Sequence, residues 1–213
     1  MTNLSTTNQA TRAWYDVFAN FYDASLDGVY REHRHQTVRA MKIEPGMTVV
    51  DVGCGTGAFL PFLVEAVGPT GRVIGADASP GMLRKARARV ARNGWSNVTL
   101  LEINDKTSPA EIASKLGEID RVVCFLSLSV IDAWKDVLQL WFDALKPNGM
   151  LAIADVHNPK PGLHARFVEL ISRGTLSRKS WEPLQAQASS FELAWQVSSW
   201  TLGGKFFIAT GTR

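Results

Sequence analysis

The chain has 213 residues, of which 46% are hydrophobic and 20% are charged, and its formal net charge is +3. This composition is typical of a globular protein with a full core and excludes wholesale disorder. The longest apolar runs, such as 122–126 and 150–154, are far shorter than the roughly 18 residues that suggest a membrane span. The small net charge gives no indication of a nucleic-acid partner. We therefore expect one domain over residues 1–213 that binds no nucleic acid.

Two features bear on the cellular compartment. The chain has only two cysteines, Cys54 and Cys124, so a disulfide framework is not expected. The first thirty residues also lack the basic start and apolar stretch of a secretory signal peptide. Both features predict a cytoplasmic protein.

The first 45 residues are expected to form a helical region ahead of a core over residues 46–213. Apolar and aromatic residues recur there at helical spacing: Trp14, Val17, Phe18, Phe21 and Tyr22. Such a stripe predicts a helix packed on the core, and it also suits a lid over one edge of the core. Tyr22, Tyr30 and Arg31 are the polar-tipped residues expected to face a ligand.

Five short, largely apolar segments alternate with helical patterns after residue 45. They lack the polar–apolar alternation of a half-exposed strand, as expected for strands that helices cover on both faces. These segments are 48–53, 72–77, 98–103, 121–127 and 150–156. The alternation predicts an α/β fold with a doubly wound parallel sheet.

Two further strand-like segments, 192–200 and 205–212, are separated by only four residues. A parallel pairing needs a connection of about a dozen residues or more, so these strands would pair antiparallel. We therefore predict a seven-stranded sheet with six parallel strands and the last one reversed.

A glycine-rich loop, VVDVGCGTG at 49–57, ends the first predicted strand. Gly53, Gly55 and Gly57 permit a tight turn and a close approach of backbone N–H groups to a ligand. The loop leads into a helix N-terminus, which suits an electron-rich group. Loops of this kind bind more than one cofactor, and Gly53-x-Gly55-x-x-Ala58 also fits a loose dinucleotide fingerprint.

Two acidic residues bear on the choice between a dinucleotide and S-adenosylmethionine as the cofactor. Asp77 ends the second strand, twenty residues after Gly57. At this spacing a carboxylate can bind the ribose hydroxyls of an adenosine, in NAD or in S-adenosylmethionine. Asp51 lies inside the first strand, where an ionised carboxylate is costly unless a cation or donors meet it. A pyrophosphate would be repelled there, whereas S-adenosylmethionine brings an ammonium and a sulfonium. The alternative is that Asp51 only holds the amides of the loop.

Five motifs in this order resemble the class I S-adenosylmethionine-dependent methyltransferases, over roughly residues 12–213. The glycine-rich loop resembles the first motif of that family, and GADASPGML resembles the second. Further similarities lie at Asn104-Asp105, at the strand IDRVV with its exit SLS, and at LKPNGML. The motifs stand at 49–57, 75–83, 104–105, 119–129 and 145–151.

The resemblance implies S-adenosylmethionine as the cofactor and a set of residues that bind it. The loop and Asp51 would hold its methionine part, Asp77 its ribose, and two residues just after Asp77 would flank its adenine. The adenine amino group would meet one of two polar residues that follow the third strand. The expected cofactor-binding residues are Tyr22, Asp51, Gly53, Cys54, Gly55, Gly57, Asp77, Ala78, Met82, Asn104, Asp105 and Phe125. Of these, Phe125 suits a core position equally well.

His157 and Tyr22 are the candidate catalytic residues. His157 directly follows the fifth strand, at the edge where open α/β sheets bind ligands, although a polar residue at a strand exit is the alternative. Methyl transfer from a sulfonium needs a base only when the acceptor must lose a proton. His33 and His35 are expected to be solvated. No histidine pair or cysteine cluster has metal-ligand spacing, so no metal is expected.

The segment 158–183 interrupts the alternation and is expected to border the acceptor pocket. It carries five basic residues against two acidic ones, and 84–92 carries five more basic residues. These are either solvated faces or a basic rim that makes peripheral contact with an anionic membrane surface. The layout is similar to methyltransferases that act on small-molecule or lipid-like acceptors: quinone precursors, lipid amines or phospholipid headgroups.

Two other functions stay open at this point. An NAD(P)-dependent oxidoreductase would need a base at its hydride site, such as Tyr-x-x-x-Lys, and no tyrosine here has a lysine four residues later. A non-catalytic S-adenosylmethionine-binding protein would keep the pocket without the chemistry.

Overall fold

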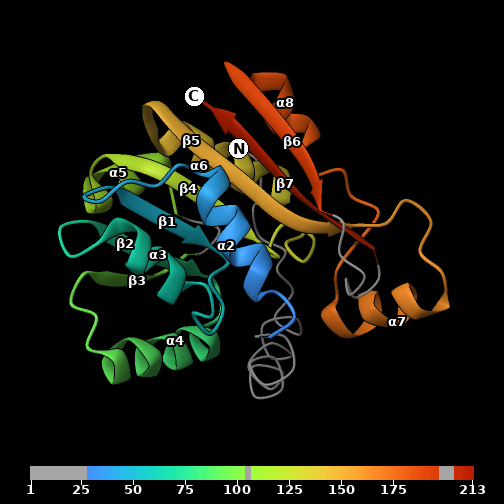
Figure 1. The fold of residues 1–213 in the computed structure, drawn as a ribbon, viewed down its shortest axis with the longest axis horizontal. Coiled ribbons are helices and arrows are strands. Elements are labelled where there is room, and N and C mark those ends of the chain that lie inside the picture. Colours follow the sequence, from blue (N-terminus) through green and yellow to red (C-terminus); the bar gives the residue numbers. More distant parts are fainter. Residues whose placement is uncertain (1–27, 104–106, 197–203) are drawn as a thin grey trace.

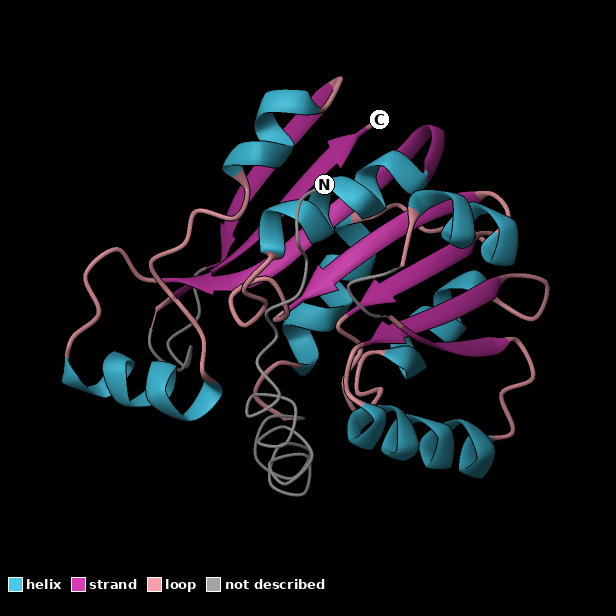
Figure 2. Cartoon of the chain, turned by 180° about the vertical axis from the view of Figure 1, so that it is seen from behind, coloured by secondary structure: helices cyan, strands magenta, loops and turns pink. Residues whose placement is uncertain are grey.

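A computed structural model describes residues 28–103, 107–196 and 204–213. Within these ranges lies one seven-stranded sheet in the order β3-β2-β1-β4-β5-β7-β6 (Figures 1 and 2). Its strands are β1 Thr48–Val52, β2 Arg72–Asp77, β3 Val98–Glu102, β4 Ile119–Phe125, β5 Leu145–His157, β6 Ser190–Gln196 and β7 Lys205–Thr212. Only the pairs that include β7 are antiparallel. The predicted α/β sheet, with six parallel strands and a reversed last strand, is confirmed.

Helices cover both faces of this sheet (Figure 1). Apolar residues of α2, α3 and α4 pack on one face, and those of α5, α6 and α8 pack on the other. The helices are α2 Arg31–Ala40, α3 Leu60–Val67, α4 Pro80–Asn93, α5 Pro109–Leu116, α6 Trp134–Ala144, α7 Leu163–Ser172 and α8 Glu182–Gln187. In the described part of the chain, no helix combines the length and the apolar character needed to cross a membrane.

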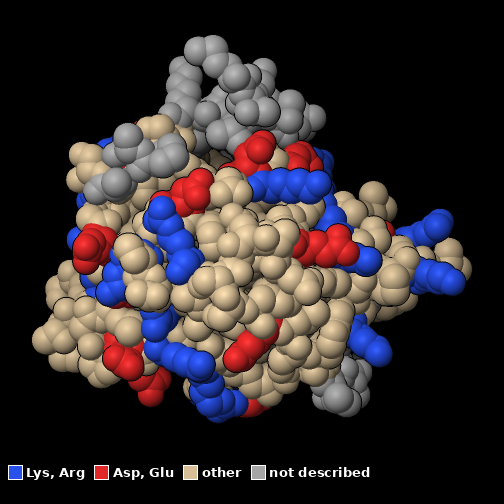
Figure 3. Space-filling view, turned by 90° about the horizontal axis from the view of Figure 1, so that it is seen from above, with Lys and Arg blue, Asp and Glu red and all other residues tan. Residues whose placement is uncertain are grey.

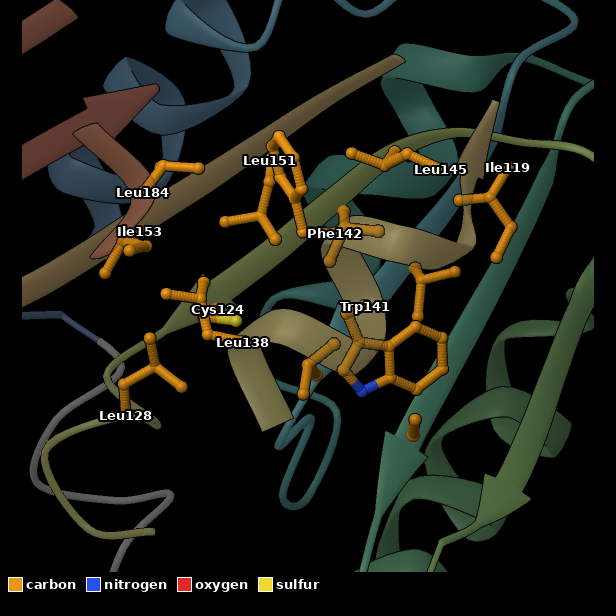
Figure 4. Packing of buried hydrophobic residues seen from close by; sticks show 14 of the residues in the cluster. Ile119, Cys124, Leu128, Leu138, Trp141, Phe142, Leu145, Leu151, Ile153 and Leu184 are labelled. Atoms are coloured by element: carbon orange, nitrogen blue, oxygen red, sulfur yellow. The ribbon is translucent and has the colours of Figure 1, made fainter. Parts of the chain in front are cut away.

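The strand period of two divides the strand residues between two cores. Val50 and Val52 of β1 face the core that contains Trp141 of α6, which is fully buried (Figure 4). Val49 faces the other core, beneath α2 and α3. Asp51 therefore points to the same side as Val49 and toward α2.

The start of β5 differs from the sequence prediction. The strand begins at Leu145 rather than at residue 150, because Leu145 pairs with Ile119 across an irregularity in the register. Asn148 adopts a φ of +62° within this segment. The Lys-Pro-Asn-Gly sequence thus bends the strand instead of separating it from α6.

Asp120 ties three elements together at the amino end of the sheet. Its carboxylate accepts a hydrogen bond from the Thr48 N–H at 2.7 Å and pairs with Lys146. Burial acts to raise the pKa of Asp120, but the Lys146 ammonium and the Thr48 N–H outweigh it and hold the pKa below its usual value.

We expect Asp120→Ala to lower the free energy of unfolding by about 2 kcal/mol, since it removes a charge-assisted hydrogen bond and leaves the Thr48 N–H without its acceptor. Because the folded pKa is depressed, this contribution exists above the unfolded pKa of about 4 and disappears as the pH falls through the folded value. Urea unfolding measures it at neutral and at acidic pH. The exposed Glu65→Ala serves as the control, and equal stability of the two variants would contradict the assignment.

Candidate functional site

A cavity of about 220 Å³ opens at the carboxyl edge of the sheet. The segments after β1, β2, β3 and β4 line it, together with residues of α2, α6 and α7. The chain leaves β1 toward β2 on one side and returns to β4 on the other, and such a reversal point is where open α/β sheets bind ligands. The cavity is thus where the fold predicts a ligand.

The glycine-rich loop is held against β2. The N–H groups of Gly53 and Cys54 donate to the Ala76 carbonyl at 2.8 and 3.1 Å, and the Gly55 N–H donates to Asp77 Oδ2 at 2.8 Å. Gly53 has a φ of +71°, and a Cβ there would lie 2.6 Å from the Ser127 Cβ. Only glycine therefore fits at this point of the cavity wall.

Asp77 organises the next stretch of the wall. Its Oδ1 accepts from the Ser79 N–H at 2.8 Å, and the Ser79 hydroxyl caps α4 by accepting from the Met82 N–H at 3.1 Å. A carboxylate has about four acceptor sites. Asp77 therefore holds the loop and the start of α4 from the wall of the cavity.

Asp51 is a buried carboxylate in the wall of the cavity. The residue is 1% exposed, and its Oδ2 has no hydrogen-bond partner among the described residues. Burial, with the negative charge of Asp77 as a second cause, raises the pKa of Asp51 to about 7. The N–H groups of Gly53, Cys54 and Gly55 bond to Ala76 and Asp77, so Asp51 does not hold these three amides.

Arg34 of α2 lines the same cavity and is 4% exposed. Its guanidinium carbon lies 5.6 Å from the ring centroid of Phe125 and 5.8 Å from that of Phe62. Its positive charge acts against the raised pKa of Asp51. Sequence analysis selected Arg31, which is exposed and does not line the cavity. Helical spacing could have found Arg34, because it follows Tyr30 by four residues and so lies on the same side of a helix as a residue expected to face a ligand.

Aromatic side chains close the side of the cavity next to Arg34. The ring centroids of Phe59 and Phe125 are 4.8 Å apart, and Tyr30 meets Phe125 edge to face at 6.4 Å. Phe125 therefore packs in the core and lines the cavity at once. Toward α6 the wall is also apolar, and it contains the buried Trp141, whose indole N–H has no partner among the described residues.

The cavity brings most of the expected cofactor-binding residues together. Those in its wall are Asp51, Gly53, Cys54, Gly55, Asp77, Ala78, Met82 and Phe125. Gly57 is not part of the wall and instead turns the loop toward α3 with a φ of +80°. Tyr22, Asn104 and Asp105 lie outside the described residues.

The structure does not bring His157 to this cavity. Its ring packs against Trp181, with centroids 4.9 Å apart, and its Nδ1 lies 3.0 Å from the Arg178 carbonyl oxygen. It borders a separate, shallow depression beside Trp195. This placement matches the alternative of a polar residue at a strand exit.

The prediction that His33 is solvated was wrong. His33 is buried with its ring centroid 4.2 Å from that of Phe206, and burial lowers its pKa. Across the described ranges, no three His, Cys, Asp or Glu side chains come together in a group that could hold a metal ion.

Comparisons with known proteins find methyltransferases. A family model described as a methyltransferase domain matches residues 43–200. The demethylmenaquinone methyltransferase of Lactococcus lactis is 29% identical over 174 residues, which cover 76% of this chain and 68% of that protein. The protein of the same name from Listeria monocytogenes is 33% identical over 130 residues, covering 61% of this chain and 53% of its own length. This chain thus spans about half to two thirds of these relatives.

A solved structure shares the fold over nearly the whole chain. The S-adenosylmethionine-dependent methyltransferase from Aquifex aeolicus superposes with a TM-score of 0.64 and 20% identity. The match covers 92% of this chain and 97% of the Aquifex chain.

Proposed function

Since this chain belongs to the class I S-adenosylmethionine-dependent methyltransferases, whose methyltransferase domain it matches over residues 43–200, we propose that it methylates an apolar small molecule, and in particular a quinone precursor. The observation that carries the cofactor assignment is the buried Asp51 carboxylate, whose Oδ2 has no partner among the described residues. A cationic ligand compensates such a group, whereas a pyrophosphate does not. The names of the curated relatives support the quinone precursor.

The residues of the cavity fit this cofactor. When bound, S-adenosylmethionine supplies a methyl carbon on a positively charged sulfur, which is already a good leaving group. Asp51 would face the ammonium, and Asp77 would accept hydrogen bonds from the ribose hydroxyls. Ala78 and Met82 would flank the adenine, while Asn104, Asp105 and Tyr22 stay predictions for the same ligand.

We assign the carboxylate of the methionine part to Arg34. The guanidinium lines the same cavity as Asp51 and interacts electrostatically with it. A zwitterionic amino acid needs one partner of each sign, and an arginine binds a carboxylate through two parallel hydrogen bonds. Asp51 and Arg34 together would therefore fix the orientation of the methionine part.

The acceptor would enter from the end of the cavity near α7. Ser172 of α7 lines that end, as do Leu126 and Val130 after β4. The aromatic side chains of Tyr30, Phe59 and Phe125 exclude water, so positioning supplies much of the catalysis. The mechanism requires no metal. A hydroquinone loses one proton overall when it is methylated, and its acidic hydroxyl can release that proton to solvent before the acceptor enters, so no strong base is needed in the cavity. Peripheral contact of residues 158–183 with an anionic membrane surface, where an acceptor with an apolar tail would reside, is part of the same proposal.

The expected cytoplasmic location forms part of the same proposal. It is supported by the two cysteines, Cys54 and Cys124, which are both free and buried. Free thiols of this kind are typical of a reducing compartment.

The experiment that tests the function combines ligand binding with methyl transfer. At a hundred times its dissociation constant, S-adenosylhomocysteine should stabilise the protein by about 2.7 kcal/mol, which raises Tm by roughly 5–10 °C. NADH should have no effect. Labelled S-adenosylmethionine should then methylate hydroquinones that carry an apolar tail, and do so faster than tail-free analogues.

Two outcomes would contradict the proposal. Stabilisation by NADH and not by S-adenosylhomocysteine would indicate an oxidoreductase. Stabilisation by S-adenosylhomocysteine without methyl transfer to any hydroquinone, amine or phospholipid would indicate a non-catalytic binding protein.

Arg34→Gln should weaken S-adenosylhomocysteine binding by about ten- to a hundredfold, the range expected for a charge-assisted hydrogen bond. Binding of 5′-methylthioadenosine, which lacks the amino-acid part, should change little. Isothermal titration measures both ligands, and Arg31→Gln on the exposed face of α2 is the matched control. Equal losses for the two ligands would show that Arg34 acts on the fold rather than on the carboxylate.

A further inference from the structure

Helix α7 presents its large apolar side chains to solvent. Leu163 is 89% exposed, Phe167 58% and Leu170 73%. Their spacing of four and three residues places them on one face of the helix. The opposite face, with the small residues Ala165 and Ser172, is turned toward the protein, since Ala165 is buried and Ser172 lines the cavity. In a helix that stabilises a core, the large apolar side chains face the protein, whereas in α7 they face solvent.

The exposed charged side chains on α7 and at its two ends are basic. Lys160, just before α7, and Arg166 within it are exposed, as is Arg173, which ends the helix. Glu169 is the acid of α7, and its carboxylate accepts from the Leu176 N–H at 2.8 Å on the inner side. Figure 3 shows lysine and arginine side chains at the end of the protrusion on the right, the side on which Figure 1 draws α7.

Arg178, Lys179 and the basic residues of α4, which sequence analysis also selected, do not contribute to this surface. The Arg178 guanidinium turns inward and donates to the carbonyls of Leu128, Ser129 and Ile131, and Lys179 pairs with Glu182. The basic residues of α4 have no exposed large apolar side chain beside them within the described chain. The apolar and the basic features therefore coincide at α7.

Helix α7 is also connected to the cavity rim. The Thr175 N–H, three residues after the helix, donates to the Ser129 carbonyl at 2.8 Å, in the segment after β4 whose Ser127 and Val130 line the cavity. One end of the helix thus lies at the cavity, and its outer face lies on the surface.

We propose that α7 docks flat on an anionic lipid bilayer, with Leu163, Phe167 and Leu170 in the interface and Lys160 and Arg166 at the headgroups. An apolar face flanked by Lys and Arg is the composition that binds such interfaces, and each basic residue near an anionic surface adds to the attraction. An apolar acceptor would pass from the bilayer to the cavity past Ser172. This inference rests on the proposed function, since it supplies the route by which that acceptor arrives.

The test is sedimentation of the full chain with vesicles of phosphatidylcholine alone or mixed equally with phosphatidylglycerol. We expect binding to the anionic vesicles that falls with added salt. Phe167→Ser/Leu170→Ser should weaken it by more than about tenfold, since each apolar side chain contributes over a factor of ten when buried. Arg166→Gln should weaken it by a smaller factor, while Phe167→Leu and Arg92→Gln on α4 should bind as the unchanged protein does.

The same preparations are tested for S-adenosylhomocysteine binding, so that the two proposals fail separately. Normal cofactor binding without binding to anionic vesicles would overturn the docking of α7 alone. Vesicle binding that the double serine variant retains would place the contact elsewhere and also overturn it. A dimer that the double serine variant converts to monomers, measured by light scattering, would show a second copy on this face and reject the bilayer as its partner. Loss of cofactor binding by every preparation would reject the proposed function itself.

Discussion

The cost of burying the Asp51 carboxylate is the constraint around which the site is arranged. Val49, its neighbour on the same side of β1, is apolar, and the nearby Asp77 has the same sign, while the Arg34 guanidinium opposes the burial cost in part. The pKa of about 7 means that the protein without ligand holds a proton on Asp51 under acidic conditions. In the proposed function, a ligand that brings a positive charge would replace that proton, which would couple cofactor binding to ionisation.

The Asp77 carboxylate, unlike that of Asp51, is hydrogen-bonded to the backbone. It accepts backbone N–H groups from the glycine loop and from the start of α4, so its charge is compensated before any ligand binds. Asp77 therefore shapes the pocket, whereas Asp51 Oδ2 has no partner among the described residues and, in the proposed function, would meet the charge of the ligand. In the proposed function both carboxylates would meet the cofactor, and Asp77 also holds the backbone around the cavity.

The sequence predicted the sheet well because local signals and chain topology agree there. Apolar segments marked the strands, and the short connection before residue 205 required the reversed strand β7. The glycine loop and Asp77 could also be placed, because their roles follow from the ends of strands. Arg34 and His157 could not, since the first depends on how α2 rotates over the sheet and the second on an aromatic cluster formed with Trp181 of a distant segment. The outward apolar face of α7 was equally hidden, because a periodic pattern does not tell which face meets the core.

The most direct test of the role of Asp51 is the proton balance of cofactor binding, measured by titration calorimetry of S-adenosylhomocysteine near pH 6 in two buffers of different ionisation enthalpy. Because Asp51 is protonated there and must ionise to meet the ammonium, close to one proton (about 0.9 for a pKa near 7) should be released per ligand bound. Asp51→Asn should abolish that release. Binding of the unchanged protein with no proton released would contradict the account.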